Sequence, residues 1–180
     1  MKSLLQIAKK ASEQQIREFF QASAGQWRSE RRYYTLPQGE IKEMESIITV
    51  QFLEVGSEEL QHLAQIHQLS EDIILACGAK VTWDSTDILK ARQESQGVTL
   101  FGAAGNTLYR DRGFATSKAV TAQYYFSYPS TLCLRTEYHN SVFEEEIKLV
   151  GNKYRTRQTI ISRAGEQVMI GQYLEKRIEG

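Results

Sequence analysis

The sequence is poor in cysteine and proline, with two of each among 180 residues. Cys77 and Cys133 form no CxxC pair and no Cys/His cluster, so neither a secreted-type disulfide framework nor a zinc site is indicated. Both are expected to be buried, reduced thiols. Lys plus Arg and Asp plus Glu balance at 22 each. This lack of net charge argues against nucleic acid or an anionic membrane as a partner.

Long hydrophobic runs are also missing. No stretch approaches the roughly 18 apolar residues of a membrane span. The apolar start of the chain is interrupted by Lys9 and Lys10, unlike a signal peptide. We therefore expect a soluble, cytoplasmic protein. With neither a repeat nor a linker, residues 1–180 are expected to form one domain.

The common catalytic motifs are absent as well. The chain has no Walker A loop, no GxGxxG after a strand, no GxSxG and no HExxH. His62, His67 and His139 are scattered, so no metal site is expected. The run 144–146, three glutamates, is interpreted as a strand edge or solvated bend rather than an acid/base pair.

Two segments are predicted to be helical. Residues 1–25 form an N-terminal helical segment, in which Ser12 and Gln15 fit a capping box. A second, short helix is expected over 58–68 with Ser57 as its N-cap. Their buried faces are expected to be Ile16, Phe19 and Phe20 in the first, and Leu60, Leu63, Ala64 and Ile66 in the second.

Nearly all of the remaining chain has the pattern of strands separated by turn residues. The candidate strands are 26–36, 40–55, 77–85, 96–103, 108–114, 119–128, 131–139, 143–150, 153–162 and 167–178. Strands joined in tandem by short turns do not fit a βαβ array. They predict a mainly β fold, an up-and-down antiparallel barrel of about ten strands whose interior can hold one small ligand and whose surface is covered by the N-terminal helix.

Two strands carry charged residues at spacing two. In YRTRQT (154–159), alternation places Arg155, Arg157 and Thr159 on one face. In the strand 131–139, Glu137 lies opposite a leucine-rich face. These polar faces either point to water or line a ligand cavity, in which case Glu137 and the arginines are neighbours. Arginines and aromatic residues on strands suit a flat, carboxylate-bearing ligand, but equally an ordinary aromatic core with surface arginines.

Five stretches resemble, in order, the landmarks of the S-type phycobiliprotein lyases (the CpcS/CpeS family). They are FFQASAGQWRSERRYY at 19–34, ACGAKVTWDS at 76–85, LYRDRGFA at 108–115, LRTEYH at 134–139 and YRTRQT at 154–159. The resemblance implies a lipocalin-like, fatty-acid-binding-protein-like barrel. It also implies a lyase that attaches a phycobilin, such as phycocyanobilin, through a thioether to a cysteine of an apo phycobiliprotein subunit of phycocyanin, allophycocyanin or phycoerythrin type.

The resemblance also assigns roles to residues. Arg155 and Arg157 would pair with the two bilin propionates, and Thr159 would add a hydrogen bond. Glu137 would accept hydrogen bonds from pyrrole N–H groups or favour a protonated bilin. It is the candidate catalytic proton donor. The nucleophile is the acceptor's cysteine, so no permanent cofactor is implied and the bilin is the substrate.

Further positions follow from the same motifs. Trp83 would pack against the tetrapyrrole, and Trp27 and Arg31 would close the cavity or help to hold a propionate. The motif at 110–112, Arg-Asp-Arg, fits either a hairpin ion pair or a pocket or docking role.

Residues 32–34, Arg-Tyr-Tyr, stand where Thr and His are frequent in the family. This departure leaves several alternatives open. One set of alternatives concerns the working unit, which is a monomer that acts alone, a homodimer, or a heterodimer in which this chain is the non-autonomous half beside a paralogous lyase subunit. A noncatalytic bilin or lipid carrier on the same barrel is the main rival function.

Overall fold

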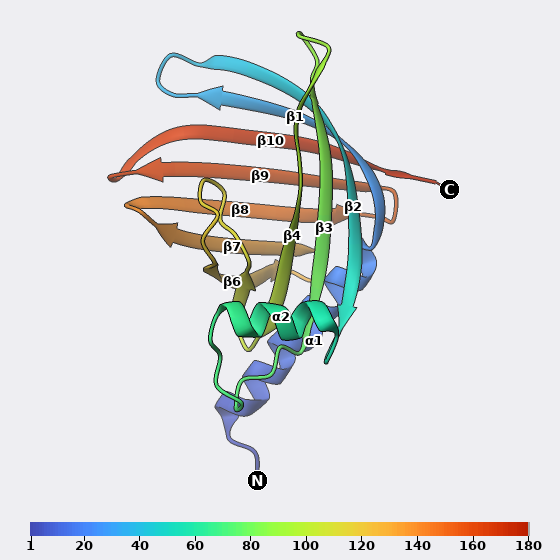
Figure 1. The fold of residues 1–180 in the computed structure, drawn as a ribbon, viewed down its shortest axis with the longest axis vertical. Helices are drawn as coiled ribbons and strands as arrows, with labels where there is room; N and C mark the ends of the chain where they lie inside the picture. The colour runs from blue at the N-terminus through green and yellow to red at the C-terminus, as the bar shows by residue number, and fades with distance from the viewer. Residues whose placement is uncertain (180) are drawn as a thin grey trace.

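A computed structural model describes residues 1–179, without the side chains of Gln93 and Glu94; Gly180, the end of the expected domain, lies outside the described residues. The chain forms a closed antiparallel barrel of ten strands and two helices, which confirms the predicted fold class (Figure 1). The strands are β1 (Gly25–Thr35), β2 (Glu40–Glu54), β3 (Cys77–Asp87), β4 (Arg92–Ala104), β5 (Thr107–Arg110), β6 (Val120–Tyr128), β7 (Thr131–Tyr138), β8 (Ser141–Val150), β9 (Tyr154–Arg163) and β10 (Glu166–Ile178).

Each strand pairs with the next along the chain, and β1 closes the barrel by pairing with β10. In Figure 1 the strands β2 to β4 run steeply across the direction of β7 to β10. The two groups therefore face each other across the interior. Side chains alternate between this interior and the outer surface, as the period of two requires.

Strand β5 ends at Arg110, four residues earlier than predicted. The Asp111 carboxylate accepts a hydrogen bond from the Leu100 backbone at 3.0 Å, and Gly113 N donates to Thr116 O at 3.0 Å. These bonds turn the chain away from the ladder.

Helix α1 (Leu4–Ser23) begins earlier than its predicted cap. Ser3 and Gln6 form the capping box, with Ser3 Oγ accepting from Gln6 N at 3.2 Å. The predicted box at Ser12 and Gln15 is wrong, because the preceding segment 4–11 is rich in Leu, Ala and Lys, which favour helix. The buried face of Ile16, Phe19 and Phe20 is confirmed.

Helix α2 (Glu58–Ile66) packs on the outer surface of β4. Ser57 is its N-cap, as predicted, and accepts from Leu60 N at 3.4 Å. Leu60 and Leu63 are buried, whereas Ile66 is 38% exposed and does not belong to the buried stripe. Neither described helix combines the length and hydropathy needed to cross a bilayer.

The main core lies inside the barrel, where helix α1 closes one end. Phe19 of the helix meets Phe126 of β6 edge to face, with ring centroids 5.7 Å apart. The cluster also includes Trp27, Ile48, Leu108 and Leu132. Because the helix covers this end, the space left within the barrel lies between α1 and inward-facing residues of the strands, including polar residues of β8 and β9.

Candidate functional site

The barrel contains a cavity with an apolar wall and a cluster of arginines. It holds about 1120 Å³ of space not filled by atoms, including solvent at its mouth. Its apolar wall includes Phe20, Val81, Trp83, Phe101 and Leu132. Its charged lining residues are Arg31, Arg110, Arg112, Glu145, Arg155 and Arg157. An apolar cavity with a few converging charges is the usual form of a small-molecule site.

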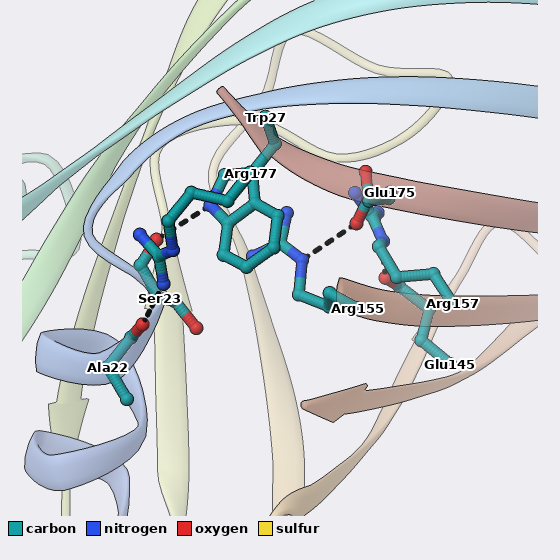
Figure 2. A network of polar contacts seen from close by, with 8 residues as sticks. All are labelled: Ala22, Ser23, Trp27, Glu145, Arg155, Arg157, Glu175 and Arg177. Atoms are coloured by element: carbon teal, nitrogen blue, oxygen red, sulfur yellow. Dashed lines mark hydrogen bonds and ion pairs between the residues drawn. The ribbon is translucent and has the colours of Figure 1, made fainter. Parts of the chain in front are cut away.

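Arg155 and Arg157 point into the barrel, as the inward interpretation of YRTRQT requires. Arg155 also forms an ion pair with another residue of the barrel. Its Nε donates to Glu175 Oε1 at 2.7 Å, and the two side chains are 6% and 0% exposed (Figure 2). Arg155 and Glu175 face each other on β9 and β10, so strand register produces this pair.

Each member of this pair keeps the other charged. Burial acts to raise the pKa of Glu175, but the nearby guanidinium groups of Arg155 and Arg157 lower it overall. Burial lowers the pKa of Arg155 in spite of the attraction of Glu175. Arginine remains protonated because its ordinary pKa is above about 12. The site therefore contains a buried ion pair.

Trp27 is fully buried and forms part of the structural frame. Its indole N–H donates to Ser23 O at 2.9 Å, and the guanidinium carbons of Arg155 and Arg177 lie 4.7 and 4.3 Å from its ring centroid (Figure 2). Trp27 is not a cavity-lining residue. Trp27 packs in the core against the end of α1, and its predicted roles in closing the cavity or holding a propionate stay predictions.

Arg177 fastens the end of α1 to this frame. Its Nη1 and Nη2 donate to Ala24 O and Ala22 O at 2.5 and 2.6 Å. A Cβ at Gly25, whose φ is +126°, would lie 2.7 Å from Arg177 Nη1. Glycine therefore lets the guanidinium reach the orphan carbonyls of the helix terminus.

Arg157 belongs to a second polar group, in which its side chain is 20% exposed. Its Nη2 is 3.5 Å from Glu145 Oε2, and its guanidinium carbon is 5.0 Å from the Tyr173 ring centroid. The guanidinium carbon of Arg31 lies 5.5 Å from the same centroid. Burial acts to lower the pKa of Arg157, but Glu175 and Glu145 raise it overall. Arg31 and Arg157 each keep a buried Nε with no hydrogen-bond partner among the described residues.

Thr159 shares the inward face of β9 with the two arginines, as predicted, and is 3% exposed. It pairs in register with Gly171 of β10 and Glu145 of β8, and it is not among the lining residues. Its hydrogen bond to a ligand stays a prediction.

Trp83 lines the cavity on β3. A Cβ at Gly97 on the paired strand would lie 2.6 Å from the Trp83 ring, so glycine there provides the space for the indole. The guanidinium carbon of Arg112 lies 6.0 Å from the ring centroid. Trp83 is thus placed to pack against a cavity ligand.

Glu137 lies on the outer surface of β7. Its side chain is 61% exposed, and its Oε1 accepts from Arg135 Nε at 2.8 Å. The prediction that Glu137 shares a cavity with Arg155 and Arg157 is wrong. In this strand the leucine face is the inner one, so alternation sends Glu137 to water.

Glu145 is the carboxylate that lines the cavity. The sequence predicts a strand over 143–150, which β8 confirms, but the interpretation of 144–146 as a strand edge or solvated bend gives none of these glutamates an inward position. Alternation turns only the middle one inward, where it is 7% exposed. Glu175 was missed for another reason, since only the register of β9 with β10 reveals its partner.

Arg110 and Arg112, from the Arg-Asp-Arg motif, both line the cavity. The Asp111 carboxylate is bound to the Leu100 backbone, and no ion pair within the motif occurs in the described part of the chain. A pocket role, rather than a hairpin ion pair, is therefore supported for both arginines.

Comparison with known proteins gives one consistent relationship. The protein is 71% identical over 178 residues to "Putative phycocyanobilin lyase CpcS 2" of Nostoc sp. (strain PCC 7120), with 99% of each chain covered. It is 50% identical over 161 residues to "Putative chromophore lyase CpcV" of Picosynechococcus sp. (strain PCC 7002), covering 89% of this chain and 80% of that protein.

The fold has a counterpart among solved structures. The S-type phycobiliprotein lyase CPES from Guillardia theta superposes with a TM-score of 0.76 at 19% identity, with 99% of each chain covered. The sequence model described as CpeS-like protein matches residues 15–178. The chain therefore belongs to the CpeS-like family.

Proposed function

We propose that the protein is a chromophore lyase that binds a phycobilin, phycocyanobilin or a close relative, and attaches it through a thioether to a cysteine of an apo phycobiliprotein subunit. The observation that carries this proposal is the cavity itself. Five arginines and one glutamate line a space whose other lining residues are mostly apolar or aromatic. The names of the relatives point to the same chemistry.

The cavity suits an open-chain tetrapyrrole because such a ligand is flat, conjugated and carries two propionates. Aromatic side chains such as Trp83 and Phe101 can pack on its rings. Guanidinium groups bind carboxylates through paired N–H donors, which fixes orientation as well as affinity. A lipid carrier would need one carboxylate partner at most, so the number of arginines favours a bilin.

The chemical role proposed for the cavity is to orient the substrate. The acceptor's thiolate attacks the ethylidene carbon of ring A and forms the C–S bond, while the exocyclic double bond becomes a single bond. The adjacent ring carbon takes up one proton, which replaces the proton that the thiol lost, so the thiol adds across the double bond with no leaving group. Holding one bilin conformer with this carbon at the cavity mouth makes addition faster and more selective. The protein itself contributes no nucleophile in this scheme.

Glu145 takes the role that was predicted for Glu137. Its carboxylate faces the cavity beside Arg157, whereas that of Glu137 faces water. We propose that Glu145 accepts hydrogen bonds from the pyrrole N–H groups and favours a protonated bilin. This arrangement keeps a proton close to the reacting ring. The proposed setting for this reaction is the cytoplasm.

A transfer assay tests the function. The purified protein is mixed with phycocyanobilin and an apo subunit, and covalent product is followed as a zinc-fluorescent band on a denaturing gel. The protein should raise the rate above the spontaneous background, and an acceptor whose cysteine is replaced by serine should give no band.

Binding of the bilin without faster attachment to any acceptor would leave a noncatalytic carrier as the function. Attachment only after addition of a paralogous lyase subunit would show the non-autonomous half of a heterodimer. Size measurement of the active fraction separates a monomer from a homodimer.

A further inference from the structure

The arginines of the cavity differ in what already binds them. Arg155 donates to Glu175 at 2.7 Å, and Arg157 lies 3.5 Å from Glu145. Arg110 has no ion pair with any described residue, and its Nε has no hydrogen-bond partner among them. Arg110 is therefore a buried cation with unused hydrogen-bonding capacity.

The position of Arg110 is well defined. Its side chain is 8% exposed, and its guanidinium carbon lies 4.8 Å from the Phe101 ring centroid and 4.6 Å from that of Phe114. Its backbone carbonyl is 2.8 Å from the His67 ring nitrogen Nε2. The two rings attract the cation without a carboxylate or carbonyl oxygen of their own, so the N–H donors at the edge of the guanidinium group remain available.

The acidic residues nearby do not occupy this edge. The neighbouring Asp111 is committed to the Leu100 backbone at 3.0 Å. Glu145 attracts Arg110 electrostatically, but the ion pair that Glu145 forms is with Arg157. A buried guanidinium with unpaired donors is costly, and the cost is removed when a ligand supplies a carboxylate.

We propose that Arg110 binds a carboxylate of the ligand, one of the two propionates of the bilin, through the edge of its guanidinium group. Phe101 and Phe114 hold the group in orientation. The second propionate binds at Arg157 and Arg31, whose Nε groups are also unpaired, while Arg155 is a structural partner of Glu175. This inference rests on the proposed function and assigns its carboxylate anchors.

The test compares phycocyanobilin with its dimethyl ester, which keeps the tetrapyrrole but loses both negative charges. Binding is titrated by absorbance with the wild type, with Arg110→Gln, and with Arg135→Gln as the matched control on the outer surface. Arg110→Gln should weaken binding of the free acid about tenfold or more, equivalent to about 1.4 kcal/mol. Binding of the ester should change little, and the control should bind both ligands as the wild type does.

A measurement on the wild type covers the case in which Arg110→Gln does not fold. The Nε–H resonance of Arg110, assigned by its loss in Arg110→Lys, should shift when the free acid binds and stay nearly unchanged when the ester binds. An equal shift with both ligands, or none with either, contradicts the proposal.

Two further outcomes separate the inference from the proposed function. If the wild type binds phycocyanobilin but Arg110→Gln weakens acid and ester equally, Arg110 is only part of the wall and the inference fails alone. If the wild type binds neither ligand, the proposed function fails and the inference fails with it.

Discussion

Replacing Arg155 with methionine would remove the cation that is hydrogen-bonded to Glu175 inside the barrel. The two side chains are 6% and 0% exposed and are joined at 2.7 Å. Removing one partner of a buried pair leaves an uncompensated charge and costs about 3–5 kcal/mol. Since domains of this kind are stable by about 5–15 kcal/mol, the variant should lose a large share of its stability.

Urea denaturation followed by circular dichroism measures this loss. The matched control is Arg135→Gln, which breaks two pairs on the outer surface, with Glu137 and Glu144, whose side chains are 49–61% exposed. Exposed pairs contribute about 0–1 kcal/mol, so the control should unfold close to the wild type.

A double variant, Arg155→Met with Glu175→Leu, tests the cause of the loss. Removing both charges should restore much of the stability, because an apolar pair in place of a buried ion pair is often neutral or stabilising. A loss below about 1 kcal/mol in Arg155→Met, or a double variant as unstable as the sum of the single changes, would refute the reasoning.

Three other predictions concern titration, thiol reactivity and the cavity carboxylate. The pKa of Glu175 is lowered on folding, so the free energy of unfolding should fall as the pH drops below 4.5, the ordinary pKa of this carboxyl. In a series of urea melts at different pH, Glu175→Gln should show a smaller decrease over this pH range. Burial raises the pKa of Cys77 to about 11, so iodoacetamide at pH 8 should label this thiol far more slowly in the folded than in the denatured protein, as read by mass spectrometry; equal rates would contradict its burial. Glu145→Gln should lower the rate of bilin transfer about tenfold or more, whereas Glu137→Gln should leave it unchanged, and the reverse order would return the role to Glu137.

Most of the fold follows from local patterns that the sequence displays. Turn residues separate nearly all the strands, and the period of two within them correctly predicts that Arg155 and Arg157 share a face with Thr159. The capping box of α1 is predicted in the wrong place because two S-x-x-Q segments, at Ser3 and Ser12, fit the same cap. Local pattern alone does not choose between them.

The candidate site was only partly predictable, because its partners come from strand register. Glu175 is 20 residues from Arg155 and becomes its neighbour only when β9 pairs with β10. Which face of β7 is inner depends on what fills the barrel, and the leucines fill it, so Glu137 was assigned to the wrong side. The sequence does not decide between the two roles of Arg110, because nothing in it shows that Asp111 binds a backbone amide.

The most direct test of the central claim is a crystal structure of the protein with phycocyanobilin. We predict that the tetrapyrrole lies inside the barrel against Trp83, with one propionate on Arg110 and the other on Arg157 and Arg31. Arg155 should remain bound to Glu175. A bilin bound on the outer surface, or propionates that contact none of these three arginines, would contradict the account.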